Sequence, residues 1–326
     1  MIVQLSPDAD TDGVRRALVA AGLWVTPLLD AGRVRHFAVS RASASVDADA
    51  LLRIPGVASV AAPASAHPKV DAANAVVDVA GVRIGAGVPA FVAGPCAVEG
   101  EAQIHAVAAR VAAAGATILR GGAFKPRTSP YAFQGHGDVA LRWMREAADA
   151  SGLRVVTEAL AEGDVAHVAE LSHAIQIGSR NMQNFALLKA VGRAARPVVL
   201  KRAMSATVEE WLLAGEYLLD HGATGVVYCE RGIRGFDPAT RNLLDLGAVA
   251  LLAHVHGLPV LVDPSHATGR RDLVLPLARA GLAAGAAGVM FETHDDPGRA
   301  LSDGPQALDP QDFDTVMRAL GAPRRG

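Results

Sequence analysis

Apolar residues from about position 90 onward gather in eight short runs, and each run is followed by a stretch with helical periodicity. The runs lie at 90–94, 116–120, 154–158, 174–178, 197–201, 225–229, 259–263 and 288–292. They are almost continuously hydrophobic, as is typical of parallel strands covered on both faces. Eight strand–helix units over about 240 residues predict an α/β fold, a (β/α)8 TIM barrel, with a doubly wound open sheet as the alternative.

The first part of the chain has a different pattern. Strand-like segments are expected at 2–5, 23–25, 36–39 and 56–60, and helices at 14–21 and 48–53. The resulting order β-α-β-β-α-β is that of a small ferredoxin-like α+β domain. Residues 61–68 are small and include prolines, so they read as a linker. We therefore expect a ferredoxin-like domain over 1–65, a linker and the start of a hairpin over 66–80, and the barrel over 81–326.

Composition narrows the classes of partner. A net charge of -2 with 20% charged residues gives no overall basic field, which argues against nucleic acid. The chain has two cysteines, Cys96 and Cys229, so a disulfide framework is not expected and a reducing cytoplasm fits. The first residues lack the pattern of a signal peptide, and no apolar run approaches the roughly 20 residues of a membrane span.

Polar residues follow almost every predicted barrel strand, and in a barrel these strand ends meet at one mouth. One group is cationic: Arg120, Lys125, Arg127, Arg180, Lys201, Arg231 and Arg234. Any single member could form a salt bridge to a neighbouring carboxylate. Seven converging cations favour phosphate, which arginine binds bidentately and lysine binds as a point charge. This many cations would serve two phosphate sites.

A second group mixes a thiol, an imidazole and carboxylates at strand ends: Cys96, His266, Glu292 and Asp303. Such donors suit a divalent transition metal such as Mn, Fe, Co or Zn. Each residue alone has a plainer interpretation, as a packed thiol, a hydrogen-bonded loop histidine or a turn aspartate. Glu292 and His294 lie two apart on one strand and face the same way, so the residues leave the choice between them open.

Six motifs in the chain resemble those of 3-deoxy-D-arabino-heptulosonate 7-phosphate (DAHP) synthases of the type I beta group. They occur in the same order, over about residues 77–310. The runs are GPCAVE (94–99), LRGGAFKPRTSPYAFQG (119–135), QIGSRNMQNF (176–185), CERGIR (229–234), DPSH (263–266) and ALSDG (300–304). The N-terminal segment is similar to the small regulatory domain of some members in pattern only.

The resemblance implies a set of site residues. The metal ligands would be Cys96, His266, Glu292 and Asp303, which favours Glu292 over His294. The ion would be Mn, with Fe, Co, Zn or Cd as alternatives. Phosphoenolpyruvate would be held by Arg120, Lys125, Glu158, Arg180, Lys201 and Arg231, and erythrose 4-phosphate by Lys125, Pro126, Arg127, Thr128 and Asp303. Catalysis would rest on Lys125, Cys96 and His266, with Lys125 or a metal-bound water giving a proton to the new alkoxide.

The implied reaction joins phosphoenolpyruvate, erythrose 4-phosphate and water to give DAHP and phosphate, the first step of the shikimate pathway. One alternative is the related synthase of an eight-carbon sugar acid, which has Asn where this chain has Pro126 and Arg127; another is a barrel that binds phosphorylated sugar without catalysis. Two positions depart from the family pattern, Ala203 in place of Gly and Gly235 in place of Thr. The resemblance also implies a homodimer or homotetramer and an aromatic amino acid effector.

Overall fold

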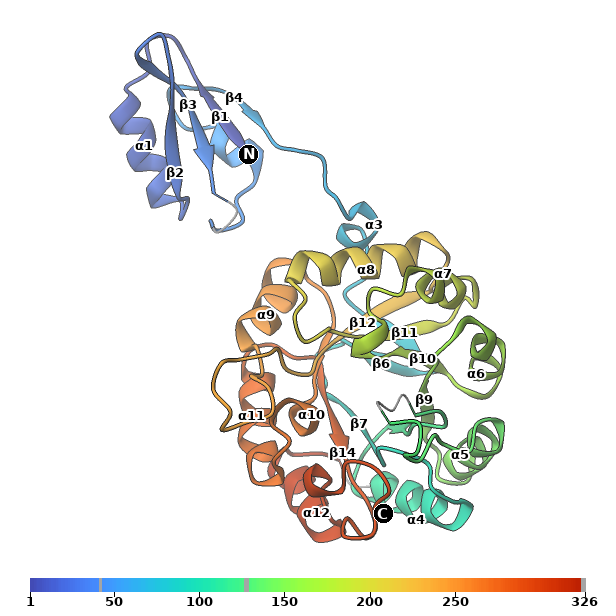
Figure 1. The fold of residues 1–326 in the computed structure, drawn as a ribbon. Coiled ribbons are helices and arrows are strands. Elements are labelled where there is room, and N and C mark those ends of the chain that lie inside the picture. Colours follow the sequence, from blue (N-terminus) through green and yellow to red (C-terminus); the bar gives the residue numbers. More distant parts are fainter. Residues whose placement is uncertain (41–42, 126–128, 324–326) are drawn as a thin grey trace. The chain divides into compact units, whose positions relative to one another are not determined.

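The computed structural model describes residues 1–40, 43–125 and 129–323 (Figure 1). The chain divides into two compact units, Met1–Ala66 and His67–Gly326. Each unit has its own hydrophobic core. None of the helices in the described part combines the length and the apolar character needed to cross a membrane.

The first unit is a four-stranded antiparallel sheet with two helices. Its elements are β1 (Ile2–Leu5), α1 (Thr11–Ala20), β2 (Val25–Asp30), β3 (Arg33–Val39), α2 (Ala48–Leu52) and β4 (Val57–Ala61), with strand order β2-β3-β1-β4. Asp10 caps α1 by accepting a hydrogen bond from the backbone N of Gly13. Val3, Leu18 and Phe37 are buried between the sheet and the helices. This element order and strand order are those of a ferredoxin-like fold.

The strand predicted at 23–25 is mostly wrong, because β2 begins at Val25 and runs to Asp30. Every residue of β2 after Val25 is exposed, so the segment carries no alternation of buried and exposed positions that could reveal it. Ala31 and Gly32 have φ values of 48° and 79°, as in the tight turns that join antiparallel strands. The turn therefore fixes the length of this hairpin.

The second unit contains the barrel. After α3 (Pro68–Asp71) and the hairpin β5 (Val77–Val79) and β6 (Val82–Ile84) come eight parallel strands. They are β7 (Ala90–Gly94), β8 (Ile118–Arg120), β9 (Arg154–Glu158), β10 (Ala174–Ile177), β11 (Pro197–Lys201), β12 (Gly225–Glu230), β13 (Val260–Val262) and β14 (Gly288–Glu292). They close in the order β10-β11-β12-β13-β14-β7-β8-β9, so the predicted (β/α)8 barrel is confirmed and the open sheet is wrong.

Helices surround these strands (Figure 1). The α-helices are α4 (Glu101–Ala113), α5 (Asp138–Ala150), α6 (Val165–Leu171), α7 (Phe185–Arg193), α8 (Val208–Asp220), α9 (Leu246–Ala250), α10 (Pro264–Thr268), α11 (Val274–Ala283) and α12 (Pro310–Ala319). Short helices of other types are η1 (Glu162–Asp164), η2 (Ser179–Asn181), η3 (Leu251–Val255), η4 (Arg271–Leu273) and η5 (Gly304–Gln306).

Closure of the barrel depends on the pairing of β14 with β7. The register runs from Gly288 opposite Ala90 to Glu292 opposite Gly94. A Cβ atom on Gly288 would lie 2.1 Å from the Ala90 carbonyl oxygen, and one on Gly94 would lie 1.9 Å from the Arg120 carbonyl oxygen. Glycine is therefore required at both positions, where backbones approach too closely for a side chain.

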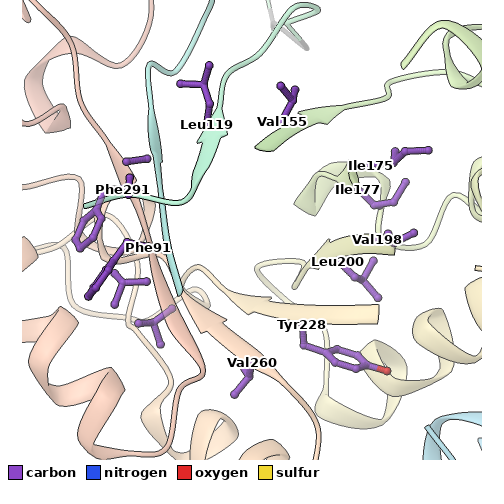
Figure 2. Close-up of a cluster of buried hydrophobic side chains, with 14 of the residues drawn as sticks. Phe91, Leu119, Val155, Ile175, Ile177, Val198, Leu200, Tyr228, Val260 and Phe291 are labelled. Atoms are coloured by element: carbon purple, nitrogen blue, oxygen red, sulfur yellow. The ribbon is translucent and has the colours of Figure 1, made fainter. Parts of the chain in front are cut away.

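The core has two layers because side chains alternate along each strand. Outward-facing residues such as Phe91, Leu119 and Tyr228 pack against the helices, and Figure 2 shows these side chains pointing away from the ring of strands. Inward-facing residues such as Val92 and Cys229 form a separate cluster inside the barrel, joined by Val77, Val79 and Ile84 of the β5–β6 hairpin. The hairpin thus packs against the barrel interior.

Candidate active site

A cavity of about 410 Å³ opens where the carboxyl ends of the barrel strands meet. Six cationic side chains line it: Arg120, Lys125, Arg180, Lys201, Arg231 and Arg241. Glu158 and Asp303 are the two carboxylates among its lining residues. A small anion with several negative charges is therefore the ligand that this cavity suits best.

Beside the cavity, four potential metal ligands come together. One ligand atom of each of Cys96, His266, Glu292 and Asp303 lies within 4.8 Å of those of the other three. Cys96 follows β7, Glu292 ends β14, and His266 lies in the first turn after β13. Asp303 comes from the loop after β14 and adopts a left-handed backbone conformation, with φ of 51°. The strands that carry three of these residues are direct neighbours in the barrel, which explains why residues so distant in sequence meet.

Glu292 is fully buried among donors. Its Oε1 accepts from Arg120 Nη1 at 3.0 Å and lies 3.0 Å from His266 Nε2, while Gln306 Nε2 donates to its Oε2. Burial alone would raise the pKa of this carboxyl, but His266 and Arg120 hold it well below its usual range. Glu292 is therefore ionised, and its carboxylate faces His266, another member of the cluster.

The Cys96 thiol is the second buried member of the cluster. Its Sγ lies 3.0 Å from Lys125 Nζ, 3.1 Å from Ser302 Oγ and 3.2 Å from Asp303 Oδ2. Burial, with a further contribution from Glu292, raises the pKa of this thiol to about 12. Among polar neighbours such as these, the thiol is placed differently from Cys229, which packs in the barrel interior.

His294 points to a different partner. Its Nε2 lies 3.3 Å from Glu99 Oε2, and its Nδ1 accepts from the backbone N of Asp296 at 3.0 Å. Glu99 also accepts from the backbone N of Leu301 at 2.8 Å. His294 therefore fixes the loop that leads to Asp303, and the geometry places Glu292, not His294, in the cluster.

The cavity cations are more heavily paired than the sequence suggested. Arg120 pairs with Glu292, and Lys201 Nζ lies 2.6 Å from Asp263 Oδ2. For these two cations, the alternative of a salt bridge to a neighbouring carboxylate is therefore the one that the structure shows. Both acids are fully buried. Arg231 is also buried, and burial lowers the pKa of this guanidinium.

Two arginines differ from the expected cation set. Arg234 is exposed and does not line the cavity. Arg241, which was not among the predicted cations, does line it and lies 3.9 Å from Asp303. Arg241 belongs to the long loop between β12 and α9 rather than to a strand end, so its place was not indicated by the pattern. Pro126, Arg127 and Thr128 lie outside the described residues.

The two departures from the family pattern have little local effect in the structure. Ala203 packs half-buried against the core, and its backbone N donates to Met182 Sδ at 3.2 Å. Gly235 is exposed, and a Cβ atom there would meet its nearest neighbours at 3.9 Å. A larger side chain would therefore fit at position 235.

Comparison with known proteins agrees with this geometry. Residues 65–322 match the DAHP synthetase I family. The chain belongs to this family. As a family member it is 50% identical over 254 residues to phospho-2-dehydro-3-deoxyheptonate aldolase of Thermotoga maritima, a match that covers 78% of this chain and 74% of that protein.

Among solved structures, one match covers nearly the whole chain. The crystal structure of the Thermotoga maritima DAHP synthase matches 98% of this chain and 96% of its own, with a TM-score of 0.77 and 41% identity. A truncated form of that enzyme matches 77% of this chain and 92% of its own, with a TM-score of 0.71 and 46% identity. A 2-dehydro-3-deoxyphosphooctonate aldolase of Rhodopseudomonas palustris is more distant, at 31% identity over 75% of this chain and 91% of that protein.

Proposed function

We propose that this chain is a 3-deoxy-7-phosphoheptulonate synthase that condenses phosphoenolpyruvate with erythrose 4-phosphate and water to give DAHP and phosphate. The observation that carries the proposal is the joining of a six-cation cavity to the Cys96, His266, Glu292 and Asp303 cluster, in a member of the DAHP synthetase I family. A barrel that only binds a phosphorylated sugar would have no need for the cluster.

The cluster fits a divalent metal ion. A thiol, an imidazole and two carboxylates within 4.8 Å match the donors that Mn, Fe, Co, Zn or Cd accept, with Mn our first choice. When bound, the ion would supply Lewis-acid polarisation of the aldehyde oxygen. Since Cys96 is a free thiol, a reducing compartment such as the cytoplasm would keep this donor set intact.

The cavity residues would bind and orient the two anions. Arg120, Lys201, Arg180 and Arg231, with Glu158 beside them, would hold the phosphate and carboxylate of phosphoenolpyruvate, so that its C3 faces the aldehyde carbon. A carbon–carbon bond forms there, and positive charge develops at C2. Water adds to C2, and phosphate leaves with cleavage of its bond to carbon.

We infer that Lys125 transfers a proton. Its Nζ donates to the Cys96 carbonyl oxygen at 2.9 Å and lies 3.0 Å from the Cys96 thiol, so the ammonium is held between the cavity and the cluster. The aldehyde oxygen becomes an alkoxide as the new bond forms, and Lys125 would donate the proton that neutralises it.

The aldose is the point on which the alternative reaction differs. An eight-carbon product implies a five-carbon aldose phosphate, because phosphoenolpyruvate supplies three carbons. The Lys125, Pro126, Arg127 and Thr128 run favours the four-carbon aldose by resemblance, with Arg127 and Thr128 on its phosphate and Asp303 nearby. The greater identity to the heptonate enzyme than to the octonate enzyme supports the same choice.

The N-terminal unit supplies none of the candidate site residues, all of which lie between Cys96 and Asp303. We propose that it is a regulatory domain that binds an aromatic amino acid. A homodimer or homotetramer is the assembly that we expect.

The experiment that tests the function is an assay with phosphoenolpyruvate and either aldose phosphate, before and after exhaustive chelation. We expect phosphate release and DAHP formation with erythrose 4-phosphate, loss of turnover on chelation, and its return with Mn²⁺. Equal turnover of the five-carbon aldose would contradict the choice of substrate. Full activity in protein shown to contain no metal would contradict the role of the cluster.

A further inference from the structure

Asp263 lies between the four potential metal ligands and the cation-lined cavity without belonging to either set. It follows β13, and its side chain is fully buried. Its Oδ2 lies 2.6 Å from Lys201 Nζ and 2.6 Å from His266 Nδ1. Its Oδ1 accepts from the backbone N of His266 at 3.0 Å. One carboxylate thus contacts a cavity cation and a member of the cluster at the same time.

We propose that Asp263 is a positioning residue that couples metal binding at the cluster to phosphoenolpyruvate binding in the cavity. The proposal rests on the function assigned above. It adds that the two binding events are linked through a single oxygen atom, Oδ2 of Asp263.

On the side of the metal ligands, Asp263 sets the tautomer of His266. A carboxylate between a lysine and an imidazole accepts hydrogen bonds and donates none, so the proton of the ring must lie on Nδ1. The Nε2 atom lies 3.0 Å from Glu292 Oε1 and is then the ring atom left for a metal, which would take the place of any proton shared with that carboxylate. Histidine ligands in metal sites are commonly oriented by a carboxylate in this way.

On the side of the cavity, Lys201 and His266 both contact the same atom, Oδ2 of Asp263. Coordination at Nε2 would make the Nδ1–H group a stronger donor than it is in a neutral imidazole, and this would draw the Asp263 charge toward the ring. Lys201 is then neutralised less and attracts an anion in the cavity more strongly. By linkage, phosphoenolpyruvate must raise metal affinity by the same factor as metal raises the affinity for phosphoenolpyruvate.

Two further contacts join the cavity to the cluster directly, Arg120 with Glu292 and Lys125 with Cys96. Simple attraction between a bound cation and a bound anion adds to them. Removal of the Asp263 charge should therefore reduce the coupling without abolishing it.

Asp263→Asn is the central variant. Its amide can still accept from the backbone N of His266, but it presents an NH2 group to Lys201 and to His266 Nδ1, which are both donors. The imidazole then favours accepting at Nδ1 and carrying its proton on Nε2. We expect Mn²⁺ affinity, measured by calorimetry on metal-free full-length protein, to fall about 10- to 100-fold. Titration with Co²⁺, followed by thiolate-to-cobalt absorption, should show the same loss.

The coupling itself is the ratio of the phosphoenolpyruvate dissociation constants without and with Mn²⁺. We expect this ratio to exceed one in the natural protein and to fall at least threefold in Asp263→Asn. Asp245→Asn is the matched control, since Asp245 pairs with Arg202 at 2.9 Å and contacts neither Lys201 nor His266 in the described structure. Its ratio should be unchanged.

Lys201→Met keeps the test decisive if Asp263→Asn fails to fold. It leaves His266 its partner, so metal affinity without phosphoenolpyruvate should stay within about threefold, while the ratio falls. A natural protein with a ratio of one, or an unchanged ratio in the folded variants, would overturn the coupling. If the natural protein forms no DAHP, the proposed function fails instead, so the two failures are distinguishable.

Discussion

The two cysteines offer a direct test of the cluster, because both are buried but their surroundings differ. Cys96 lies among polar partners, with Lys125 Nζ at 3.0 Å and Ser302 Oγ at 3.1 Å. Cys229 is fully buried in the inward-facing apolar cluster of the barrel, beside residues such as Val227 and Leu261. The same change to serine should therefore have opposite consequences at the two positions.

At position 96, a serine hydroxyl can keep the polar contacts of the thiol, so we expect the unfolding free energy to change by less than about 1 kcal/mol. Metal binding should suffer, because a neutral hydroxyl replaces a thiolate ligand. Changes to residues that merely support ligands cost about 10- to 100-fold in metal affinity, and loss of a ligand should cost at least about 100-fold. Activity should fall with it.

At position 229, serine places a hydroxyl among aliphatic side chains, which costs about 1–3 kcal/mol. For a domain of this size, that loss corresponds to a decrease in Tm of roughly 2–10 °C. Metal affinity should stay within about threefold of the natural value, because the side chain lies in the barrel interior rather than in the cluster.

The assay pairs Mn²⁺ calorimetry with thermal unfolding of metal-free protein, so that bound metal does not add to the measured stability. Cys96→Ser should lose metal and keep its Tm, whereas Cys229→Ser should do the reverse. Unchanged Mn²⁺ affinity in Cys96→Ser, or an equal loss in both variants, would refute the assignment of Cys96.

Three further outcomes are expected. Arg180→Ala should raise the KM for phosphoenolpyruvate about 10- to 150-fold, since a charge-assisted contact contributes about 1.5–3 kcal/mol. Arg127→Ala should raise the KM for erythrose 4-phosphate instead, and the exposed control Arg234→Ala should change neither KM more than about twofold. Equal effects of Arg180→Ala and Arg127→Ala on both KM values would contradict the assignment of the two arginines to different substrates. Deletion of residues 1–65 should leave a folded, active enzyme that tyrosine, phenylalanine and tryptophan no longer inhibit, and inhibition that survives deletion would exclude the proposed regulatory role. Glu99→Gln should weaken Mn²⁺ binding about 10-fold by loosening the loop before Asp303, and circular dichroism should confirm that its fold is intact.

The barrel could be predicted because its strands carry a strong local signal. Runs such as 197–201 and 288–292 are apolar throughout, since helices cover one face and the barrel interior covers the other. Strand β2 gave no such signal, because its side chains are mostly exposed and the turn at Ala31 and Gly32 sets its end. Local patterns thus reveal buried elements better than exposed ones.

The cluster could be predicted for a related reason, since Cys96, His266 and Glu292 follow or end strands that must meet at one mouth. The ion pairs around the cluster could not be predicted. Asp263 pairs with Lys201, and Glu292 pairs with Arg120, because of distances across the barrel that sequence order does not encode. Arg241 was missed because a long loop, rather than a strand, delivers it to the cavity.

The pairing of β14 with β7 has a consequence for biosynthesis. A ribosome releases β7, with Cys96 at its end, long before Gly288 emerges to meet Ala90. Until then the growing chain exposes a parallel strand edge, the kind of surface that invites aggregation. Glu292 and Asp303 arrive with this last strand and the loop after it, so the metal cluster can assemble only on a closed barrel. Metal binding would then stabilise the pairing of β14 with β7, and only a chain that has closed its barrel would gain this stability.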